Sequence, residues 1–507
     1  MSTNNLSIVQ RPVKAADKVP VITNWNPMVG YMIYKDQNIA SLFYYKIGLQ
    51  IYLGSSASGT LLGILKQRRN GYSVDVAAGK ARAFFDIKDI VNSQLVNTLY
   101  DQNLTGSPFS TIHKLGANTY EDGGGSVDYR IFSTNGSSSQ SKTQLAQIYI
   151  RVIDCYATSA NAATVCYTPS TPVEDTAFYM QSSLDLFRSR SATASGVDTD
   201  YLQGIAFQTF CLNSGTKRFL SDNPRVAGTY FANSAGNKMV NNILEGDYHT
   251  IAFLNGETDF NSKPERFYIR YYNSAGGVIN TSYLVNQEAD GGAKPLTSGG
   301  EVSEDKERLL YFGCGAANLE GFDNGGSNLH KPSNNAGWVN YTIQATDASA
   351  TPMSEEIVFV KQDASCKGYP TRRLAWRNSL GTYDYLNFTL KSTQTIDIER
   401  NKYAKMIGVF NKSKYRYSDW DKGQAIRQTT AKQKETLNTD YILEEQAILI
   451  EKLLMSTDVY IVQNADTQLT QSVVITDSSY IKKTVVNDKL IQYSISIEYS
   501  NELNTNS

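Results

Sequence analysis

The stretch Arg372–Lys391, RRLAWRNSLGTYDYLNFTLK, decides the fold that this sequence predicts. Two strand-like segments flank a tight turn at Leu380-Gly381-Thr382, with aromatic residues on both sides. The residues that we single out are Trp376, Asn378, Gly381, Tyr383, Asp384 and Phe388. No nucleophile stands beside a base here, and no metal-ligand spacing occurs. The stretch therefore predicts a rigid structural corner or an assembly interface, not an active site.

The composition of the chain indicates a mainly β protein with several domains. Its 507 residues exceed what one hydrophobic core supports. Lys and Arg number 48 against 49 Asp and Glu, so the net charge of -1 indicates neither a nucleic-acid binder nor a membrane-surface protein. Thirty-three Tyr, with abundant Ser, Thr, Asn and Gly, favour strands and turns over helices.

Five cysteines, at positions 155, 166, 211, 314 and 366, form no CxxC pair. We expect reduced, mostly buried thiols. Cys155 and Cys166 can face one another across a hairpin, and the sequence leaves their pairing open. The N-terminus has no apolar stretch of signal-peptide length, and no run of about 18 apolar residues occurs anywhere. We therefore expect assembly in a cytoplasm and no membrane-spanning segment.

Alternation of apolar and polar residues divides the chain into domains. We expect an extended N-terminal arm over residues 1–20, β-sandwiches over 21–145, 146–260 and 261–355, and a C-terminal β domain over 356–507 with a helix at 440–456. The strongest hairpin signal is the pair Arg266–Tyr272 and Val278–Leu284, joined by a turn rich in Gly and Asn. Asp440 is the expected cap of the helix.

Candidates for catalytic chemistry are few. Gly313-Cys314-Gly315 lacks the third glycine of a dinucleotide loop, and no helix pattern follows it, so we expect a strand-end turn. The three histidines have no metal-binding spacing. Carboxylate pairs such as Glu355-Glu356 and Glu444-Glu445 can hydrolyse a glycan in principle, but a solvated face is the simpler interpretation. We expect no enzyme activity, no cofactor and no metal.

Ten basic residues lie between Arg400 and Lys434, against Asp419 and Asp421. Those that we expect to face DNA or a partner are Lys402, Lys405, Lys412, Lys414, Arg416, Lys422 and Arg427. Interleaved Tyr and Trp residues favour an interface, with a solvated face as the alternative. Residues 285–325 carry eight acidic residues against three basic ones. Opposite charges of this kind suit a ring of head-to-tail subunits.

Four stretches, taken in order, resemble virion structural proteins of tailed bacteriophages that infect Bacteroidetes, especially the crAss-like group. They are Trp25-Asn26-Pro27 with Phe43–Lys46 and Phe85–Ile90; Arg218–Arg225; the strand end with Cys366 that runs into Arg373–Asn378 and Gly381–Tyr385; and Val474–Ser479 with Lys489–Tyr493. The resemblance implies tandem immunoglobulin- or fibronectin-like sandwiches in a ring subunit of the neck or tail, located in the virion. It implies as partners identical subunits, commonly with twelvefold symmetry, other neck and tail proteins, and packaged DNA in the channel.

Two other functions fit parts of the sequence. A host-binding tail fibre or glycan-binding tail protein is favoured by the Tyr and Asn content. It predicts fibre-like repeats or a trimeric coiled coil, and the sequence shows neither. A glycan-degrading tailspike requires a cleft with paired carboxylates. A non-enzymatic ring subunit is the function that the sequence favours.

Overall fold

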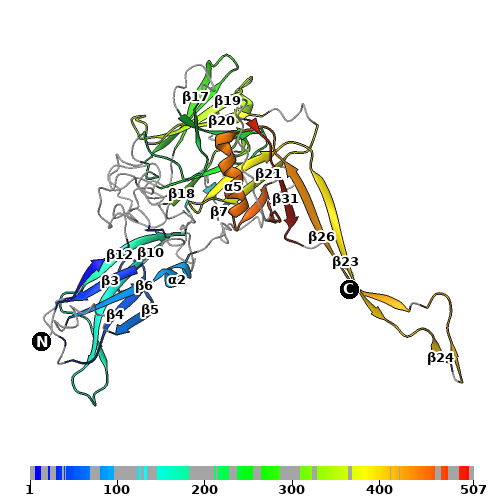
Figure 1. Cartoon of the computed structure of the whole chain (residues 1–507). Coiled ribbons are helices and arrows are strands. Elements are labelled where there is room, and N and C mark those ends of the chain that lie inside the picture. The colour runs from blue at the N-terminus through cyan, green and yellow to red at the C-terminus, as the bar shows by residue number, and fades with distance from the viewer. Residues whose placement is uncertain are drawn as a thin grey trace. The chain divides into compact units, whose positions relative to one another are not determined.

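The computed structural model confirms the mainly β fold (Figure 1). It describes residues 6–12, 21–22, 30–36, 39, 42–68, 80–95, 121–122, 125–126, 131–133, 145–181, 210–212, 215–227, 237–254, 264–285, 309–321, 328–362, 368–411, 413–421, 423–462, 470–477 and 490–501. Two compact units contain these residues. The first unit is Met1–Asn241, Tyr248–Lys361 and Asn378–Asp384; the second unit is Asn242–Asp247, Gln362–Arg377 and Tyr385–Ser507. No helix among the described residues is long and apolar enough to cross a membrane.

The first unit begins with a β-sandwich. One sheet has the order β1 (Leu6–Gln10), β3 (Gly30–Lys35), β6 (Ala81–Asp86). The other has the order β2 (Val21–Ile22), β12 (Glu174–Met180), β10 (Leu145–Ala157), β4 (Phe43–Leu53), β5 (Thr60–Arg68), with β11 (Val165–Tyr167) beside β10, and the short helix α2 spans Lys88–Asn92. Both sheets supply the core, in which Ile47, Leu49 and Ile51 alternate inward as predicted. Strand β1 pairs with β3, so part of the expected N-terminal arm is a strand of this sandwich.

The boundary expected between residues 145 and 146 is wrong. Strand β10 pairs with β4 along most of its length, for example Ile150 with Ile51, and so completes the first sandwich. A disulfide joins Cys155 in β10 to Cys166 in β11, where the register places them opposite each other. The pairing that the sequence left open is therefore present, although reduced thiols were the general expectation. Cys211 and Cys314 are buried and form no disulfide; Cys366 lies outside the described residues.

A second sandwich follows in the first unit. One sheet has the order β13 (Arg225–Ala227), β14 (Asn237–Ile243), β20 (Ile357–Lys361), β19 (Asn340–Thr346), β16 (Arg266–Tyr272), β17 (Val278–Val285). The other has the order β15 (Thr250–Leu254), β18 (Leu309–Gly313), β9 (Ile131–Ser133). The rings of Phe253, Phe267 and Phe312 pack between them, with centroids 5.2 and 4.6 Å apart.

Two predictions for this sandwich have different outcomes. The hairpin β16–β17 is confirmed, with the Asn273 amide donating to the carbonyl of Gly277. The boundary at 260 is wrong, because strands before and after it share one sheet. A helix does follow Gly315, contrary to expectation: α4 spans Ala316–Glu320. The smaller elements are η5 (Pro332–Asn334) and the pair β7 (Glu121–Asp122) and β8 (Gly125–Ser126).

The second unit is one sheet with a helix against it. The strand order is β22 (Tyr383–Phe388), β21 (Arg372–Arg377), β28 (Val459–Val462), β29 (Thr470–Ile475), β31 (Ser494–Tyr499), β26 (Gln424–Asn438), β23 (Thr393–Ala404). Helix α5 (Ala447–Met455) supplies Ala447, Ile450 and Leu453 to the core. The predicted C-terminal helix is confirmed but begins later. A short strand β27 (Ile442–Leu443), paired with β30 (Leu490–Ile491), and a 3₁₀ turn η6 (Glu444–Gln446) separate it from Asp440.

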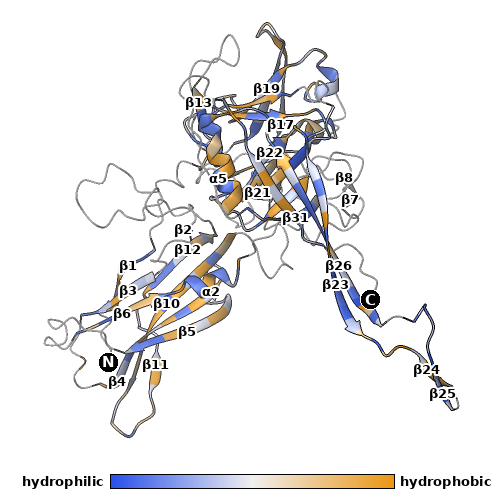
Figure 2. Ribbon diagram, turned by 45° about the vertical axis from the view of Figure 1, so that its right-hand side comes forward, coloured by the Kyte–Doolittle hydropathy of each residue, from blue (hydrophilic) through white to orange (hydrophobic). Residues whose placement is uncertain are grey.

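Strands β23 and β26 extend beyond the rest of their sheet as a long hairpin, drawn in yellow and orange in Figure 1. Strand β26 pairs with β31 only over Lys434–Asn438, so residues 424–433 pair with β23 alone. We call residues 396–404 and 424–433 the stem. The tip, residues 405–423, carries the short strands β24 (Val409–Asn411) and β25 (Lys414–Arg416), visible at the far end of the hairpin in Figures 1 and 2.

Candidate functional site

The turn at the centre of the opening stretch is built by Asn378. Its side-chain oxygen accepts hydrogen bonds from the backbone amides of Leu380, 3.1 Å, and Thr382, 2.9 Å. Its own amide donates to the carbonyl of Thr382 at 2.8 Å. Gly381 has φ +86°, a conformation that disfavours a β-carbon. The predicted tight turn is confirmed, and Gly381 is the residue whose backbone it requires.

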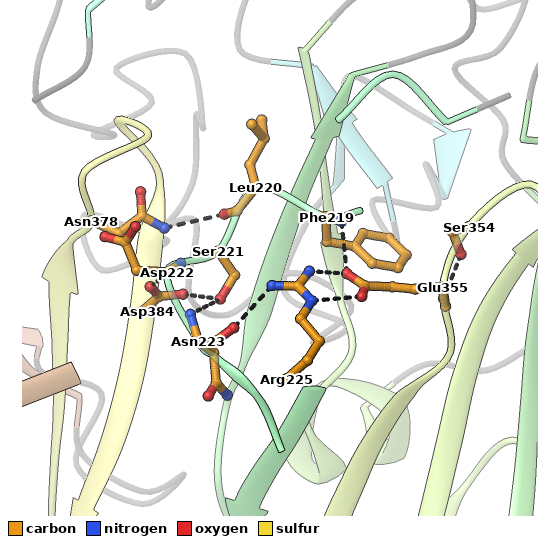
Figure 3. Close-up of polar contacts among 10 residues, drawn as sticks. All are labelled: Phe219, Leu220, Ser221, Asp222, Asn223, Arg225, Ser354, Glu355, Asn378 and Asp384. Atoms are coloured by element: carbon orange, nitrogen blue, oxygen red, sulfur yellow. Dashed lines mark hydrogen bonds and ion pairs between the residues drawn. The ribbon is translucent and has the colours of Figure 1, made fainter. Parts of the chain in front are cut away.

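A segment about 160 positions earlier in the chain lies against this turn (Figure 3). The amide group of Asn378 donates to the carbonyl of Leu220 at 3.1 Å, and the hydroxyl of Thr382 donates to the same carbonyl at 2.6 Å. Residues 219–223 have no regular structure, so these side chains satisfy backbone groups that a strand partner otherwise would. We call residues 219–223 and 378–384 together the buried cluster.

Two carboxylates lie in the buried cluster. Asp384 accepts hydrogen bonds from the hydroxyl of Ser221, 2.6 Å, and the amide of Asp222, 2.9 Å (Figure 3). Asp222 in turn accepts hydrogen bonds from the amide and hydroxyl of Ser379. Burial, followed by the charge of Asp222, raises the pKa of Asp384 to about 7. Each of these contacts holds a backbone or side-chain group of the turn in place.

The Glu355-Glu356 pair is held by cations. Glu355 forms a two-pronged ion pair with Arg225, with one N–O distance of 2.8 Å, and Glu356 pairs with Lys238 (Figure 3 shows the first). The backbone amide of Phe219 also donates to Glu355, at 3.4 Å. Each carboxylate therefore has a structural partner. The expected solvated face is wrong for this pair, because both side chains are partly buried and ion-paired.

The six corner residues predicted from the sequence are all buried. They are divided between the two units: Asn378, Gly381, Tyr383 and Asp384 belong to the first, and Trp376 and Phe388 to the second. Trp376 is fully buried in the core of the second unit, packed in the cluster that also holds Phe388. The sequence thus selected structural residues, and it gave no sign of the segment 219–223 as their partner.

The isoleucines of the stem lie on one face, which we call the apolar face, although Arg400 and Lys402 lie on it further along β23. In the register of the stem Ile396 lies opposite Gln433, and Ile398 opposite Ala431. Residues that lie opposite each other in the register share a face. Alternate residues of a strand also share a face, so Gln433, Glu435 and Leu437 of β26 lie on the face of Ile396 and Ile398. Leu437 is buried against α5, whereas Ile396 and Ile398 are 55% and 50% exposed. The face that the core covers at the base of the hairpin continues along the stem, where no described element covers it.

The other face of the stem is charged. It bears Asp397 and Glu399 on β23, and Lys432 and Lys434 on β26. Lys434 pairs with Asp397 at 2.7 Å, and Lys432 with Glu498 of β31 at 2.9 Å. A bulge at Asn401/Lys402 shifts the register, which brings Ile426 opposite Lys402 and onto the apolar face. The stem is thus an amphipathic ribbon.

The predicted basic run is this hairpin. Lys402 and Arg427 lie on the stem, and Lys405, Lys414 and Arg416 lie on the tip, all exposed. Lys412 and Lys422 fall outside the described residues. In the acidic stretch 285–325, Glu320 is the only acidic residue described, and it accepts hydrogen bonds from Ser333. The pairing of opposite patches stays a prediction.

No family model matches this chain, and no curated protein matches it. Among the residues that the structure describes, no group of three His, Cys, Asp or Glu side chains is placed to hold a metal ion. Among the described residues, the long hairpin carries the most exposed apolar side chains.

Proposed function

We propose that this protein is a non-enzymatic structural subunit of a bacteriophage virion, one member of a ring in the neck or tail. The observation that carries the proposal is the uncovered apolar face of the stem. The position in a neck or tail rests on the resemblance of the four sequence stretches. Ring assembly rests on the hairpin.

The apolar side chains of an uncovered amphipathic hairpin lower its stability in water. A two-stranded hairpin without a covered face is marginally stable in water. Ile396, Ile398 and Ile426 are each about half exposed or more, and burying an aliphatic side chain fully is worth about 1.5–3 kcal/mol. A protein surface placed on this face recovers that energy if it also offers partners to Arg400 and Lys402, and it leaves the face of Asp397 and Glu399 in water. The stem therefore has the chemistry of an assembly contact.

The contact partner that we propose is another copy of the chain. A stem that packs on a different surface of the next subunit makes a head-to-tail contact, and repeated contacts of this type close into a ring when the rotation allows. The buried cluster and the ion-paired Glu355 and Glu356 supply rigid framework for such a subunit. They also favour a structural over a hydrolytic function.

The test is the mass of the purified protein by light scattering over a range of concentrations, for the natural chain and for the double variant Ile396→Asp, Ile398→Asp. We expect ring-sized oligomers for the natural chain and their loss in the variant. The matched control places the same charges on the other face, as Thr395→Asp with Gln428→Asp, and should assemble normally.

Three outcomes decide between the candidates. A natural chain that stays monomeric at every concentration, or apolar-face variants that assemble like the control, would overturn the proposal. A stable trimer that binds cell-surface glycan would favour the host-binding tail fibre. Circular dichroism of each variant establishes that it is folded before its mass is interpreted.

A further inference from the structure

The tip of the long hairpin has a surface unlike that of the stem. Among the described residues, the five most exposed large hydrophobic side chains all lie in it. They are Trp420 at 84%, Tyr417 at 73%, Phe410 at 72%, Val409 at 70% and Met406 at 66%. Monomeric soluble proteins rarely gather apolar side chains in this way unless the patch binds something.

Apolar side chains leave both faces of the tip. In the register of β24 and β25, Val409 lies opposite Arg416, and Phe410 lies opposite Tyr415. Neighbouring residues of a strand point to opposite faces, so Val409 and Phe410 project in opposite directions. A protein groove can cover only one face of such a ribbon, as we propose for the stem. The apolar side chains on both faces of the tip can be covered together only by surroundings that enclose the tip, such as a lipid layer.

The charge of this region is positive. Between Arg400 and Arg427 the sequence has eight basic residues against two acidic ones. Lys405, Lys414 and Arg416 are exposed among the apolar side chains. Trp and Tyr are the residues enriched where a bilayer meets water, and Lys and Arg near the surface are attracted to anionic lipid. The aromatic side chains of the tip can also stack on nucleic-acid bases, but Met406 and Val409 offer no stacking platform, and a bilayer accounts for both kinds of side chain.

The backbone of the tip is held by its own hydrogen bonds. The amide of Lys405 donates to the carbonyl of Gly423 at 2.9 Å, and that of Asp421 to the carbonyl of Ser418 at 2.9 Å. Gly408 has φ +84°, and a β-carbon there would lie 2.4 Å from the carbonyl oxygen of Arg416. Satisfied backbone groups lower the free-energy penalty of leaving water. These hydrogen bonds therefore lower the free-energy penalty for moving the described backbone of the tip out of water.

We propose that the tip binds the surface of a bilayer that contains anionic phospholipid. Val409, Phe410 and Trp420 enter the boundary between headgroups and acyl chains, and Lys405, Lys414 and Arg416 contact lipid phosphates. This inference goes beyond ring assembly and does not depend on it, because it uses the tip and not the stem.

The test is flotation of the full chain with vesicles of phosphatidylcholine alone or of phosphatidylcholine with phosphatidylglycerol. We expect binding to the anionic vesicles, reduced at high salt, and weaker binding to the neutral ones. The double variant Val409→Ser, Phe410→Ser should lose at least about tenfold in partitioning. A second variant, Lys414→Gln with Arg416→Gln, should lose the preference for anionic lipid.

The matched control removes exposed apolar side chains elsewhere, as Val278→Ser with Val474→Ser, and should bind as the natural chain does; these residues are 55% and 57% exposed. The assembly-deficient stem variant Ile396→Asp, Ile398→Asp separates the two proposals: its monomers should still bind vesicles. Binding unchanged by the tip variants, no binding to either vesicle, or binding to duplex DNA in place of vesicles would each overturn the inference.

Discussion

The buried cluster, through residues 378–384, and the long hairpin are close in the sequence, but their side chains have opposite environments. In the cluster, polar groups such as Asn378 and Asp384 are buried, and each has partners within the chain. In the hairpin, apolar groups such as Ile398 and Trp420 are exposed. Side chains of the first kind are explained by folding alone. Those of the second kind are the observation on which the proposals for the stem and the tip rest.

The largest contrast is expected between two tryptophans. Trp376→Ala should destabilise the protein by about 3–5 kcal/mol, because it removes a fully buried aromatic side chain from a core. Trp420→Ala should change the free energy of unfolding by less than about 0.5 kcal/mol, because that side chain contacts water. Denaturant unfolding of both variants measures the difference. Equal effects would remove the distinction between core and hairpin.

The second effect concerns pH. The pKa of Asp384 is about 7 in the folded chain because of burial and the charge of Asp222, whereas an unfolded Asp has a pKa of about 3.9. The folded state therefore binds more protons between these values, and the stability due to Asp384 falls as the pH rises from about 4 through about 7. Asp384→Asn should flatten this part of the curve of unfolding free energy against pH.

The matched change on the hairpin is Asp419→Asn, at an exposed position. It should leave the curve as steep as in the natural chain. A curve unaffected by Asp384→Asn would mean that another group titrates in this range.

Two glycines with positive φ allow a smaller comparison. Gly381→Ala should lower the global stability by about 1–2 kcal/mol, because it forces a β-carbon into the left-handed conformation within the buried cluster. Gly408→Ala introduces the same strain at the tip, where it should accelerate hydrogen exchange of β24 and β25 amides and leave the global unfolding transition unchanged. A shifted global transition for Gly408→Ala would show that the tip is coupled to the core.

The smallest effect is expected on the stem. Ile396→Ala with Ile398→Ala should change the unfolding free energy of the monomer by less than about 0.5 kcal/mol, because both side chains are about half exposed. Leu437→Ala, on the same face but buried, should cost about 2–5 kcal/mol. Thermal melts at low protein concentration compare them. A large loss for the isoleucine variant would mean that the chain itself covers the stem.

The sequence predicted what local patterns encode. Alternation located β4, turn chemistry located the β16–β17 hairpin, and helical spacing located α5. It did not reveal the hairpin arm of β23 and β26 as strands, because the alternation Ile396-Asp397-Ile398-Glu399 covers only four residues of β23 and the polar residues Arg400, Asn401 and Lys402 that follow do not continue it. The interleaved aromatic residues and Met406–Phe410 were the available signal.

Contacts between residues far apart in the sequence could not be predicted, for a different reason. Strand β10 pairs with β4, about a hundred residues earlier, and Leu220 contacts Asn378 although no local pattern links them. Such contacts depend on which surfaces meet after the elements form. The domain boundaries at 145 and 260 were wrong on this account, whereas the residues of the turn at Gly381 were chosen correctly.

The sequence separation between Ser221 and Asp384 also determines when their hydrogen bond can form during synthesis of the chain. Their hydrogen bond joins positions 163 residues apart. A ribosome adds about 5–20 residues per second, so Ser221 and Asp222 emerge roughly ten to thirty seconds before the carboxylate that receives their hydrogen bonds. During that interval the second sandwich lacks one of its braces, and the hairpin β23–β26, made of contacts close in sequence, has not yet been synthesised. The hydrogen bonds of the buried cluster can therefore form only after residue 384 has emerged from the ribosome.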